Sequence, residues 1–430
     1  MKEPVATTVA IPKVQPAAAF CSRRKFRVST SLNTIPVFIL AGGVGERLAP
    51  LTEVKPKPAI PFGGTHQILD FTLSNCVNSG LRNIFVLTQY QRHHLHDYIT
   101  RARLKLLQRF RWGVGEQILS LPPATGKKYR GTSEAVFQNL SLLPSTAEHV
   151  LIASGDHIYS MDYRPLLSRH ATSGADMTMA AVRHSTDEAS SFGVLDVDEN
   201  HVVTRFREKP GRDTLPDSGD VLVSMGVYVF RKDCLVELAE RATASETDFA
   251  RHVVPELVRQ QRTAAYDFGH SPQSYWRDVG TLDSYFRANM DLLGSQPKFD
   301  PDADARWPIF SLSDASSVNG DGSRISRGAV IGTCIIRDSI VSQASRIDSG
   351  SIVEKSIVLP RAHVGRGVRL RKAIVAEGVR IGNGAEIGFN SERDRERFPV
   401  TPEGIVIVKA DVEASQGRLP NRLNVHAQTA

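Results

Sequence analysis

The run Leu40-Ala41-Gly42-Gly43-Val44-Gly45-Glu46-Arg47-Leu48 decides the fold of the amino-terminal part of this chain. It follows Val37–Leu40, a short apolar run typical of a buried strand. Glycines after such a strand let backbone N–H groups approach an anion, because no side chain blocks them. Arg47 and, ten residues later, Lys57 add two positive charges. The pattern predicts a turn that binds a polyphosphate at the carboxyl end of a strand.

Two commoner phosphate loops do not match this turn. A P-loop requires Gly-Lys followed by Ser or Thr, and no such pair follows here. The dinucleotide-binding fingerprint requires a third Gly or Ala where this chain has Leu48. The order Gly-x-Gly-x-Arg-Leu, followed by Lys57-Pro58, is instead similar to the signature of the sugar-1-phosphate nucleotidylyltransferases.

The stretch from residue 35 to residue 295 alternates apolar strand patterns with helical patterns. This order predicts an α/β domain of Rossmann-like type whose sheet is mostly parallel. In such sheets ligands bind beyond the carboxyl ends of the strands, where the turn at residues 42–47 lies. The predicted strands are Val37–Leu40, Ile84–Thr88, Val150–Ala153, Met177–Val182 and Gly226–Phe230. The predicted helices are Ile68–Asn78, His94–Arg103 and Ser133–Leu143.

Residues 324–390 follow a different pattern, with an apolar residue at every fifth or sixth position and frequent small residues between. Neither a helix nor an alternating strand has that period. It is typical of the hexapeptide repeats of a left-handed parallel β-helix, in which each triangular coil stacks on the last. A sandwich of short strands is the alternative. The apolar register comprises Val330, Ile336, Val341, Ile347, Ile352, Val358, Val364, Leu370, Val375, Ile381 and Ile387.

The repeats predict assembly or regulation rather than chemistry. Other β-helices of this kind often carry acyltransferase sites, but His363 is the only histidine between residues 324 and 390 and has no obvious partner. Flat coils leave an apolar face and exposed edges to cover, which favours an oligomer.

Four segments divide the chain. We predict a catalytic domain at 35–295, a Pro-, Ser- and Asp-rich linker at 296–323, and a β-helix with a tail at 324–430. Residues 1–34 are rich in Ala, Thr and Pro and contain Glu3 as their only acid. That composition is typical of an organellar transit peptide, but equally of a disordered leader or of a start codon assigned too early.

Composition narrows the class of ligand. The 430 residues carry a net charge of +7, and the basic residues are scattered without a nucleic-acid recognition motif. Acidic small molecules, such as nucleotides and sugar phosphates, suit this charge and are favoured over nucleic acid. Since no apolar run approaches the roughly 20 residues needed to span a bilayer, no membrane partner is expected.

The four cysteines lie far apart in the sequence and form no C-x-x-C pair. This argues against a zinc site and a disulfide scaffold, and it fits a reducing compartment. We therefore expect a cytoplasmic protein, or a plastid protein if residues 1–34 are a transit peptide. His93, His94 and His96 do not predict a metal site, because on a helix they point in different directions.

Further motifs narrow the resemblance to one family, the glucose-1-phosphate adenylyltransferases or ADP-glucose pyrophosphorylases, over residues 36–409. The motifs are Pro61–Gly64, Leu73–Gly80, Thr88–Tyr90, Tyr129–Thr132, Gly155–His157, Phe206–Pro210, Ser224–Gly226 and Tyr275–Thr281. The resemblance implies that the chain converts ATP and α-D-glucose 1-phosphate to ADP-glucose and pyrophosphate with Mg²⁺ as cofactor. It also implies a homotetramer and a place in glycogen or starch synthesis.

The resemblance assigns catalytic roles to four charged residues. Arg47 contacts the polyphosphate and stabilises the leaving pyrophosphate, whereas Lys57 holds the α-phosphate and the attacking oxygen. Asp156 and Asp278 are the expected ligands of Mg²⁺. From the sequence alone Asp156 could equally cap a turn, and Asp278 could equally pair with Arg277.

It also implies three sets of binding residues. The nucleotide set is Gly42, Gly43, Gly45, Gln89, Tyr129, Gly131 and Thr132. The glucose 1-phosphate set is Gly193, Glu208, Lys209, Ser224, Tyr228, Asp248, Phe249 and Trp276, although Trp276 could equally be a core residue. The effector set is Lys55 and Arg397.

Departures from the family pattern bear on regulation. The segment before Lys57 and residues 61–67 usually carry basic residues for effectors, but here Lys55 is the only one. Lys128 stands where the family often has Trp, and Val44 stands where a basic residue or Gly is frequent. Regulation by the family's usual metabolites is therefore not expected from these residues.

Two other functions compete with the leading one. A sister enzyme would use UTP, GTP or another hexose phosphate. A regulatory subunit would keep the fold but lose the charged residues, because folding does not need them. All of them are retained, namely Arg47, Lys57, Asp156, Lys209 and Asp278.

Overall fold

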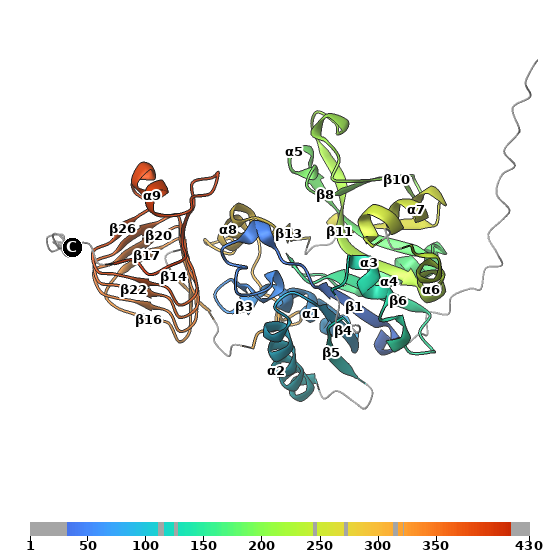
Figure 1. Cartoon of the computed structure of the whole chain (residues 1–430), viewed down its shortest axis with the longest axis horizontal. Helices are drawn as coiled ribbons and strands as arrows, with labels where there is room; N and C mark the ends of the chain where they lie inside the picture. Colours follow the sequence, from blue (N-terminus) through green and yellow to red (C-terminus); the bar gives the residue numbers. More distant parts are fainter. Residues whose placement is uncertain are drawn as a thin grey trace, which may run out of the picture.

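The computed structural model describes residues 32–110, 116–123, 128–243, 247–270, 274–312, 317–320 and 322–413. It contains an α/β domain and a stack of short coils beside it (Figure 1). Of the predicted leader 1–34 only η1 (Leu32–Thr34) falls within the described ranges, and the tail after residue 413 lies outside them. Across these ranges no helix combines the length and the apolar character that crossing a membrane requires.

A nine-stranded sheet forms the centre of the α/β domain. β1 (Pro36–Ala41) lies between β4 (Asn83–Thr88) and β6 (His149–Ser154) and is parallel to both. β5 (Gln117–Leu121) adds a further parallel strand beside β4. Successive residues of β1 enter two different apolar clusters, one on each face of the sheet. The strands are therefore apolar throughout, as parallel strands covered on both faces are.

The other half of the sheet is built around the long strand β11 (Asp220–Arg231). β11 is antiparallel to β6, β8 and β9, and its register shifts between Ser224 and Tyr228. The parallel arrangement expected from the sequence is thus confirmed on the side of the glycine-rich turn. The opposite side is mostly antiparallel, and only β12 and β8 form a parallel pair among its described strands. The remaining strands are β8 (Met177–Ser185), β9 (Gly193–Val197), β10 (Val203–Glu208) and β12 (Thr263–Asp267).

Helices pack on this sheet. α1 has the predicted bounds, because a capping box between Gln67 and Asp70 fixes its start. The predicted helix Ser133–Leu143 is shorter: α3 ends at Phe137 and a 3-10 turn follows at Leu140–Leu142. There the Asn139 amide donates to the Ala135 carbonyl and to the Tyr129 hydroxyl. The helices are α1 (Ile68–Asn78), α2 (Arg92–Phe110), α3 (Thr132–Phe137), α4 (Tyr163–Ser173), α5 (Thr186–Ala189), α6 (Lys232–Arg241), α7 (Val254–Arg259) and α8 (Leu282–Met290).

A separate two-stranded sheet joins distant parts of the α/β domain. β7 (His157–Tyr159) runs antiparallel to β13 (Trp276–Asp278), and the register sets His157 opposite Asp278. Since Asp156 immediately precedes β7, this pairing brings the two predicted metal ligands to the same place.

The second part of the molecule is the predicted left-handed parallel β-helix. From β15 to β26 the coils contribute strands to three sheets of parallel pairs, and equivalent residues lie 16 or 17 positions apart. At the two ends, β14 pairs antiparallel with β15, and β27 follows its parallel partner β24 after 33 positions. Buried serines repeat with the coil: the Ser339 hydroxyl accepts the Ser356 N–H, and the Ser356 hydroxyl accepts the Ala373 N–H. The strands run from β14 (Ser317–Gly320) and β15 (Ser323–Ser326) through β16 (Val330–Ile331), β17 (Ile335–Arg337), β18 (Ile340–Val341), β19 (Arg346–Ile347), β20 (Ile352–Glu354), β21 (Ile357–Val358), β22 (His363–Val364), β23 (Arg369–Arg371), β24 (Ala373–Val375), β25 (Arg380–Ile381) and β26 (Glu386–Ile387) to β27 (Val406–Val408).

The predicted apolar register is buried at most of its positions. Two members depart from it: Val330 is 59% exposed, and Ile352 is half-buried while its neighbour Val353 points inward. Val353 takes this position because it pairs with Ile336, one coil earlier. A spacing of five or six residues does not distinguish Ile352 from Val353, because both lie five or six positions from Ile347 and from Val358.

One face of the β-helix packs along the α/β domain. Ile340, Ile357 and Ile374 share an apolar cluster with Leu48 and Phe62 of the α/β domain. The buried Arg324 donates to the Gly63 carbonyl at 3.1 Å and pairs with Asp300 and Asp302. Further along this face, Glu377 pairs with Lys55 and with Arg361. The β-helix is therefore attached to the segment that carries Lys57.

The segment between the two parts is packed in its described portion. Ile309 and Phe310 are buried, and the Phe310 N–H donates to the Ser74 hydroxyl. The boundaries 35–295, 296–323 and 324–430 stay a prediction.

Candidate functional site

The glycine-rich turn follows β1, as predicted. Gly45 has a φ of +72° and precedes the 3-10 turn Glu46–Leu48. A Cβ at Gly45 would lie 2.9 Å from the Cβ of Lys57, so glycine is required both by the backbone conformation and by this close approach. The Thr52 hydroxyl donates to the Gly45 carbonyl at 3.0 Å and so fixes the turn. Gly42 lies against Gln89, whereas Gly43 is exposed.

Lys57 is the centre of the charged cluster at this edge of the sheet. Its Nζ lies 2.9 Å from Oδ2 of Asp156 and 2.9 Å from Oδ1 of Asp278. Its side chain is only 7% exposed. The Ser154 hydroxyl donates to the other oxygen of Asp156. The structure thus brings together Lys57, Asp156 and Asp278, which lie far apart in the sequence.

Charge pairing determines the ionisation of this cluster. Burial alone would raise the pKa of Asp156, but the positive charge of Lys57 outweighs burial and holds that pKa well below its ordinary value. Burial would likewise lower the pKa of Lys57, but Asp156 and Asp278 raise it above its ordinary value. Asp156 and Lys57 are therefore both charged at neutral pH.

Arg47 lies beside the same cluster. Its guanidinium approaches the Asp278–Gly280 segment, since a Cβ at Gly280 would lie 3.0 Å from its Nη2. Arg47 is exposed, and within the described ranges it forms no ion pair. It is therefore available to an anion from solvent.

His157 is the residue of this cluster that the sequence did not single out. Its Nε2 lies 3.6 Å from Oδ1 of Asp156 and 3.9 Å from Oδ1 of Asp278. The ligand atoms of Asp156, His157 and Asp278 all lie within 4.8 Å of one another. The set can hold a divalent cation, because two carboxylates and one imidazole are common metal ligands. In the sequence, the position of His157 next to Asp156 is the only indication that it belongs to the site. The pairing of β7 with β13 is what directs His157 toward Asp278.

The predicted nucleotide residues form a wall beside the turn. The Gln89 side-chain carbonyl accepts the Tyr129 N–H. A Cβ at Gly131 would lie 2.1 Å from the Thr247 carbonyl oxygen, so no other residue fits there. The Thr132 hydroxyl donates to Asp248 at 3.2 Å and accepts the Phe249 N–H at 3.0 Å. Thr132 therefore joins the predicted nucleotide wall to the predicted glucose site.

The predicted glucose residues gather around β9, β10 and β11. Gly193 pairs with Glu208 across β9 and β10. Burial raises the pKa of Glu208, and Lys209 lies 3.8 Å from its carboxylate. Ser224 and Tyr228 contact each other through their hydroxyls at 3.3 Å, and burial raises the pKa of Tyr228 to about 12. These groups are hydrogen-bonding partners of the kind that sugar hydroxyls require.

Two further predicted residues complete this region. Asp248 caps the π-helical turn Phe249–Val253 by accepting the Arg251 N–H, and Phe249 packs on Tyr228 and Phe230. Trp276 is 6% exposed and its Nε1 has no hydrogen-bond partner in the described part of the chain. Its ring contacts His157 at 5.2 Å between centroids. Trp276 therefore packs between the charged cluster and the glucose region, and core packing accounts for most of its surface.

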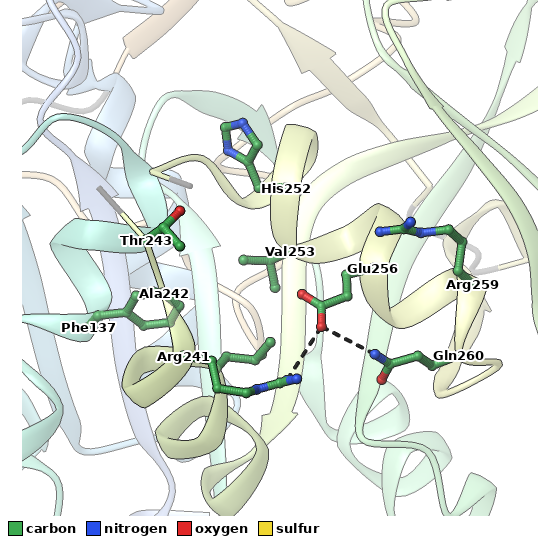
Figure 2. Close-up of a pocket in the computed structure, with 10 residues that line it drawn as sticks. Phe137, Arg241, Ala242, Thr243, His252, Val253, Glu256, Arg259 and Gln260 are labelled. Atoms are coloured by element: carbon green, nitrogen blue, oxygen red, sulfur yellow. Dashed lines mark hydrogen bonds and ion pairs between the residues drawn. The ribbon is translucent and has the colours of Figure 1, made fainter. Parts of the chain in front are cut away.

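A hollow of about 510 Å³ lies on the other side of the same π-helical turn. In its middle Glu256 accepts from Gln260 at 3.2 Å and pairs with Arg241 at 3.4 Å (Figure 2). None of the predicted substrate residues lines it. It borders the glucose region through His252, whose Nδ1 accepts the Asp248 N–H, and through Phe137, whose ring packs on Phe249.

The two predicted effector residues have separate surroundings. Lys55 pairs with Glu377, whereas Arg397 ends α9 (Ser391–Arg397) and packs on Phe398. No hydrogen bond or ion pair among the residues described here joins the two. An effector site that contains both stays a prediction.

Family comparisons agree with this geometry. Residues 36–295 match the family model described as nucleotidyl transferase, and residues 310–408 match one described as a GlmU-like, C-terminal hexapeptide. The first covers more than half of the chain, and the second covers the β-helix.

Curated relatives narrow the assignment. A glucose-1-phosphate adenylyltransferase of Methylobacillus flagellatus is 41% identical over 90% of this chain and 95% of its own length. One from Thiobacillus denitrificans is 40% identical over 86% of this chain and 89% of its own. Glucose-1-phosphate adenylyltransferase 2 of Alkalilimnicola ehrlichii is 39% identical over 88% of this chain and 94% of its own.

This chain belongs to the glucose-1-phosphate adenylyltransferases. In this adenylyltransferase the predicted residues fall into two groups that share one edge of the sheet. The charged group surrounds Lys57, and the polar group surrounds Tyr228 and Asp248. The family assignment agrees with the resemblance found in the sequence, whereas the role of each site residue is a proposal.

Proposed function

We propose that this chain transfers the adenylyl group of ATP to α-D-glucose 1-phosphate, forming ADP-glucose and pyrophosphate, with Lys57, Asp156 and Asp278 at its catalytic centre. The observation that carries the proposal is the pair of 2.9 Å contacts from Lys57 to the two carboxylates, at the end of the glycine-rich turn. Family membership supplies the reaction, and this cluster supplies a place for it.

The reaction demands positioning and neutralisation of charge. An oxygen of the sugar phosphate attacks the α-phosphorus of ATP, and the bond to the bridging oxygen of the leaving pyrophosphate breaks on the opposite side. Arg47 is exposed beside Asp278 and so is suited to the charge that grows on pyrophosphate. Lys57 lies deeper and is suited to the α-phosphate and the attacking oxygen.

We assign Mg²⁺ to Asp156 and Asp278. The residues fit a hard cation, because two carboxylate oxygens already converge on one positive charge, that of Lys57. When bound, Mg²⁺ neutralises phosphate charge and orients the polyphosphate. The carboxylates hold it at the edge of the sheet, and β7 paired with β13 keeps them in register.

The sugar is assigned to the region of Glu208, Tyr228 and Asp248. Their oxygens lie on neighbouring elements, and Thr132 ties this region to the nucleotide wall. Lys209 is half-exposed next to Glu208 and is assigned to the sugar phosphate. The remaining predicted residues, Gly193, Ser224, Phe249 and Trp276, are assigned to the same region. A homotetramer is our proposal for the assembly, and the apolar β-helix would supply its contacts.

Pyrophosphate release tests the proposal. The full chain is assayed with glucose 1-phosphate and Mg²⁺ against ATP, UTP, GTP, CTP and dTTP, beside Asp156→Asn. We expect release with ATP that is lost in the variant. Release with another nucleotide instead would assign a sister enzyme. No release with any nucleotide, from protein whose circular dichroism is that of a folded α/β protein, would favour the regulatory-subunit alternative.

A further inference from the structure

Lys57 already occupies the position that a metal ion would take. Its Nζ is equally distant, at 2.9 Å, from one oxygen of Asp156 and one of Asp278. The stem of the side chain is packed against Gly45, and the residue is buried. The ammonium is therefore held between the carboxylates and does not extend into solvent.

His157 completes this site from a third side. Its Nδ1 lies 3.1 Å from the Met225 carbonyl oxygen, which can only accept, so Nδ1 carries a proton and donates. Nε2 then faces the carboxylate oxygens of Asp156 and Asp278. Nε2 is thus the ring atom that can ligate a cation held between the two carboxylates, because the three ligand atoms lie within 4.8 Å of one another. A cation at this point satisfies all three ligands.

Two cations cannot share these oxygens. A metal ion binds a carboxylate oxygen at roughly 2.0–2.6 Å. It would use the same oxygen lone pairs that now accept from the Lys57 ammonium at 2.9 Å. Both cations would also repel each other at such separations. Occupation by one therefore excludes the other.

We propose that the Lys57 ammonium and a divalent metal ion are alternative occupants of a single site formed by Asp156, His157 and Asp278. Lys57 neutralises the carboxylates in the nucleotide-free protein, and the phosphates of an incoming nucleotide provide the acceptors that draw it away. Free metal ion consequently binds weakly until the nucleotide arrives. The inference deepens the proposed function, on which it rests for the identity of the catalytic centre.

Metal binding to nucleotide-free protein tests this exchange. Mn²⁺ is titrated into the full chain, and free Mn²⁺ is measured by electron paramagnetic resonance. We expect Lys57→Met to bind Mn²⁺ about tenfold more tightly than the unaltered protein, which is the worth of one charge-assisted hydrogen bond. Lys55→Met is the matched control. It also removes one lysine charge, but Lys55 lies two residues before Lys57 and pairs with Glu377. Equal affinities for the Lys57→Met and Lys55→Met proteins would overturn the exchange.

A second pair of variants tests His157 as the third ligand. His157→Phe should weaken Mn²⁺ binding about tenfold in the Lys57→Met background, where competition is absent. His184→Phe is the control, because the His184 ring contacts the same Trp276 but does not face the carboxylates of Asp156 and Asp278. If His157→Phe binds Mn²⁺ as tightly as His184→Phe, the site has only two protein ligands and the proposal fails in this part.

Folding and function are separated by design. If Lys57→Met does not fold, Lys57→Gln replaces it, since its amide N–H still donates to one carboxylate while its charge is lost. Because the titration contains no nucleotide, its result is independent of turnover. If Lys57→Met binds Mn²⁺ more tightly but the unaltered protein releases no pyrophosphate, the proposed function is overturned and this inference stands. If the unaltered protein releases pyrophosphate but Lys57→Met does not change the affinity for Mn²⁺, this inference is overturned and the proposed function stands.

Discussion

The α/β domain and the β-helix use contacts of very different reach along the chain. Lys57 pairs with residues 99 and 221 positions away. In the β-helix, Ser356 and Ala373 each bond to the residue 17 positions before it. The first arrangement depends on a few contacts that each occur once, and the second repeats the same kind of contact in successive coils. Chemistry is therefore concentrated in single residues, whereas the stability of the β-helix is distributed over many.

Asp278→Asn is expected to have the largest effect, and it tests whether a single residue of the α/β domain carries activity without carrying stability. The variant keeps the shape of the side chain but removes one of the two charges around Lys57. We expect kcat to fall about 10²–10³-fold, as when a preorganised electrostatic contact is removed. The melting temperature should change little, and a large drop in it would mean that the contact is structural. Steady-state assays and thermal melts of the same protein decide between the two.

The reverse result is expected from Leu370→Ala in the β-helix. Leu370 is fully buried and pairs with Val353 and Ile387 in the coils before and after it. Loss of its side chain should lower the free energy of unfolding by about 2–5 kcal/mol. Below the melting range KM and kcat should keep their values. A change in kcat of the folded variant would contradict the separation of the two parts.

A buried acid in the first turn of α1 links pH to stability. Burial raises the pKa of Asp70 from 3.8 to about 7, and the bonds from Gln67 and Tyr98 offset this only in part. The folded protein therefore binds a proton that the unfolded chain has released. The resulting stabilisation is complete below pH 3.8 and is lost as the pH rises through about 7.

Urea unfolding at several pH values measures this effect. Between pH 4 and pH 7 the free energy of unfolding of the unaltered protein should fall by on the order of 3 kcal/mol relative to that of Asp70→Asn. Asp217→Asn, which changes an exposed acid, is the control and should follow the unaltered protein. Parallel curves for the unaltered protein and Asp70→Asn would contradict the assignment.

The smallest effect is expected where the two parts meet. Glu377→Gln breaks the pairs with Lys55 and Arg361, while Arg361→Gln leaves the Lys55 pair intact. Since partly exposed ion pairs are worth about 0.2–1 kcal/mol, kcat/KM for ATP should fall by at most about fivefold in Glu377→Gln. Arg361→Gln should leave it unchanged. The same loss in both variants would show that the contact to Lys55 does not reach the neighbouring Lys57.

The local parts of the fold could be predicted from the sequence. α1 was located residue by residue, because its apolar pattern and capping box are contained in twelve consecutive positions from Gln67 to Asn78. The β-helix followed from its repeats, although the inward turn of Val353 was missed, since it depends on pairing with the coil before. Contacts that depend on pairing are not visible in a local pattern.

The non-local parts of the site could be predicted only by resemblance. β7 and β13 have three residues each and no periodic signal, so the sequence gives no sign that His157 faces Asp278. The motif around Asp156 identified the acid but not its neighbours. Likewise, Thr132 was expected to bind the nucleotide, but its bonds to Asp248 and Phe249 connect two regions 116 and 117 residues apart.

Several contacts between the β-helix and the α/β domain constrain the number of coils. Arg324 holds the first coil to Gly63, and Glu377 holds a later coil to Lys55. Inserting one more 17-residue coil between them would move Glu377 by one strand spacing, about 4.8 Å, while Arg324 stayed in place. The number of coils between these points is therefore fixed by the distance between two loops of the other domain. The part of the β-helix beyond Glu377 is constrained as well, because Glu403 pairs with Arg287 and Lys409 pairs with Glu53.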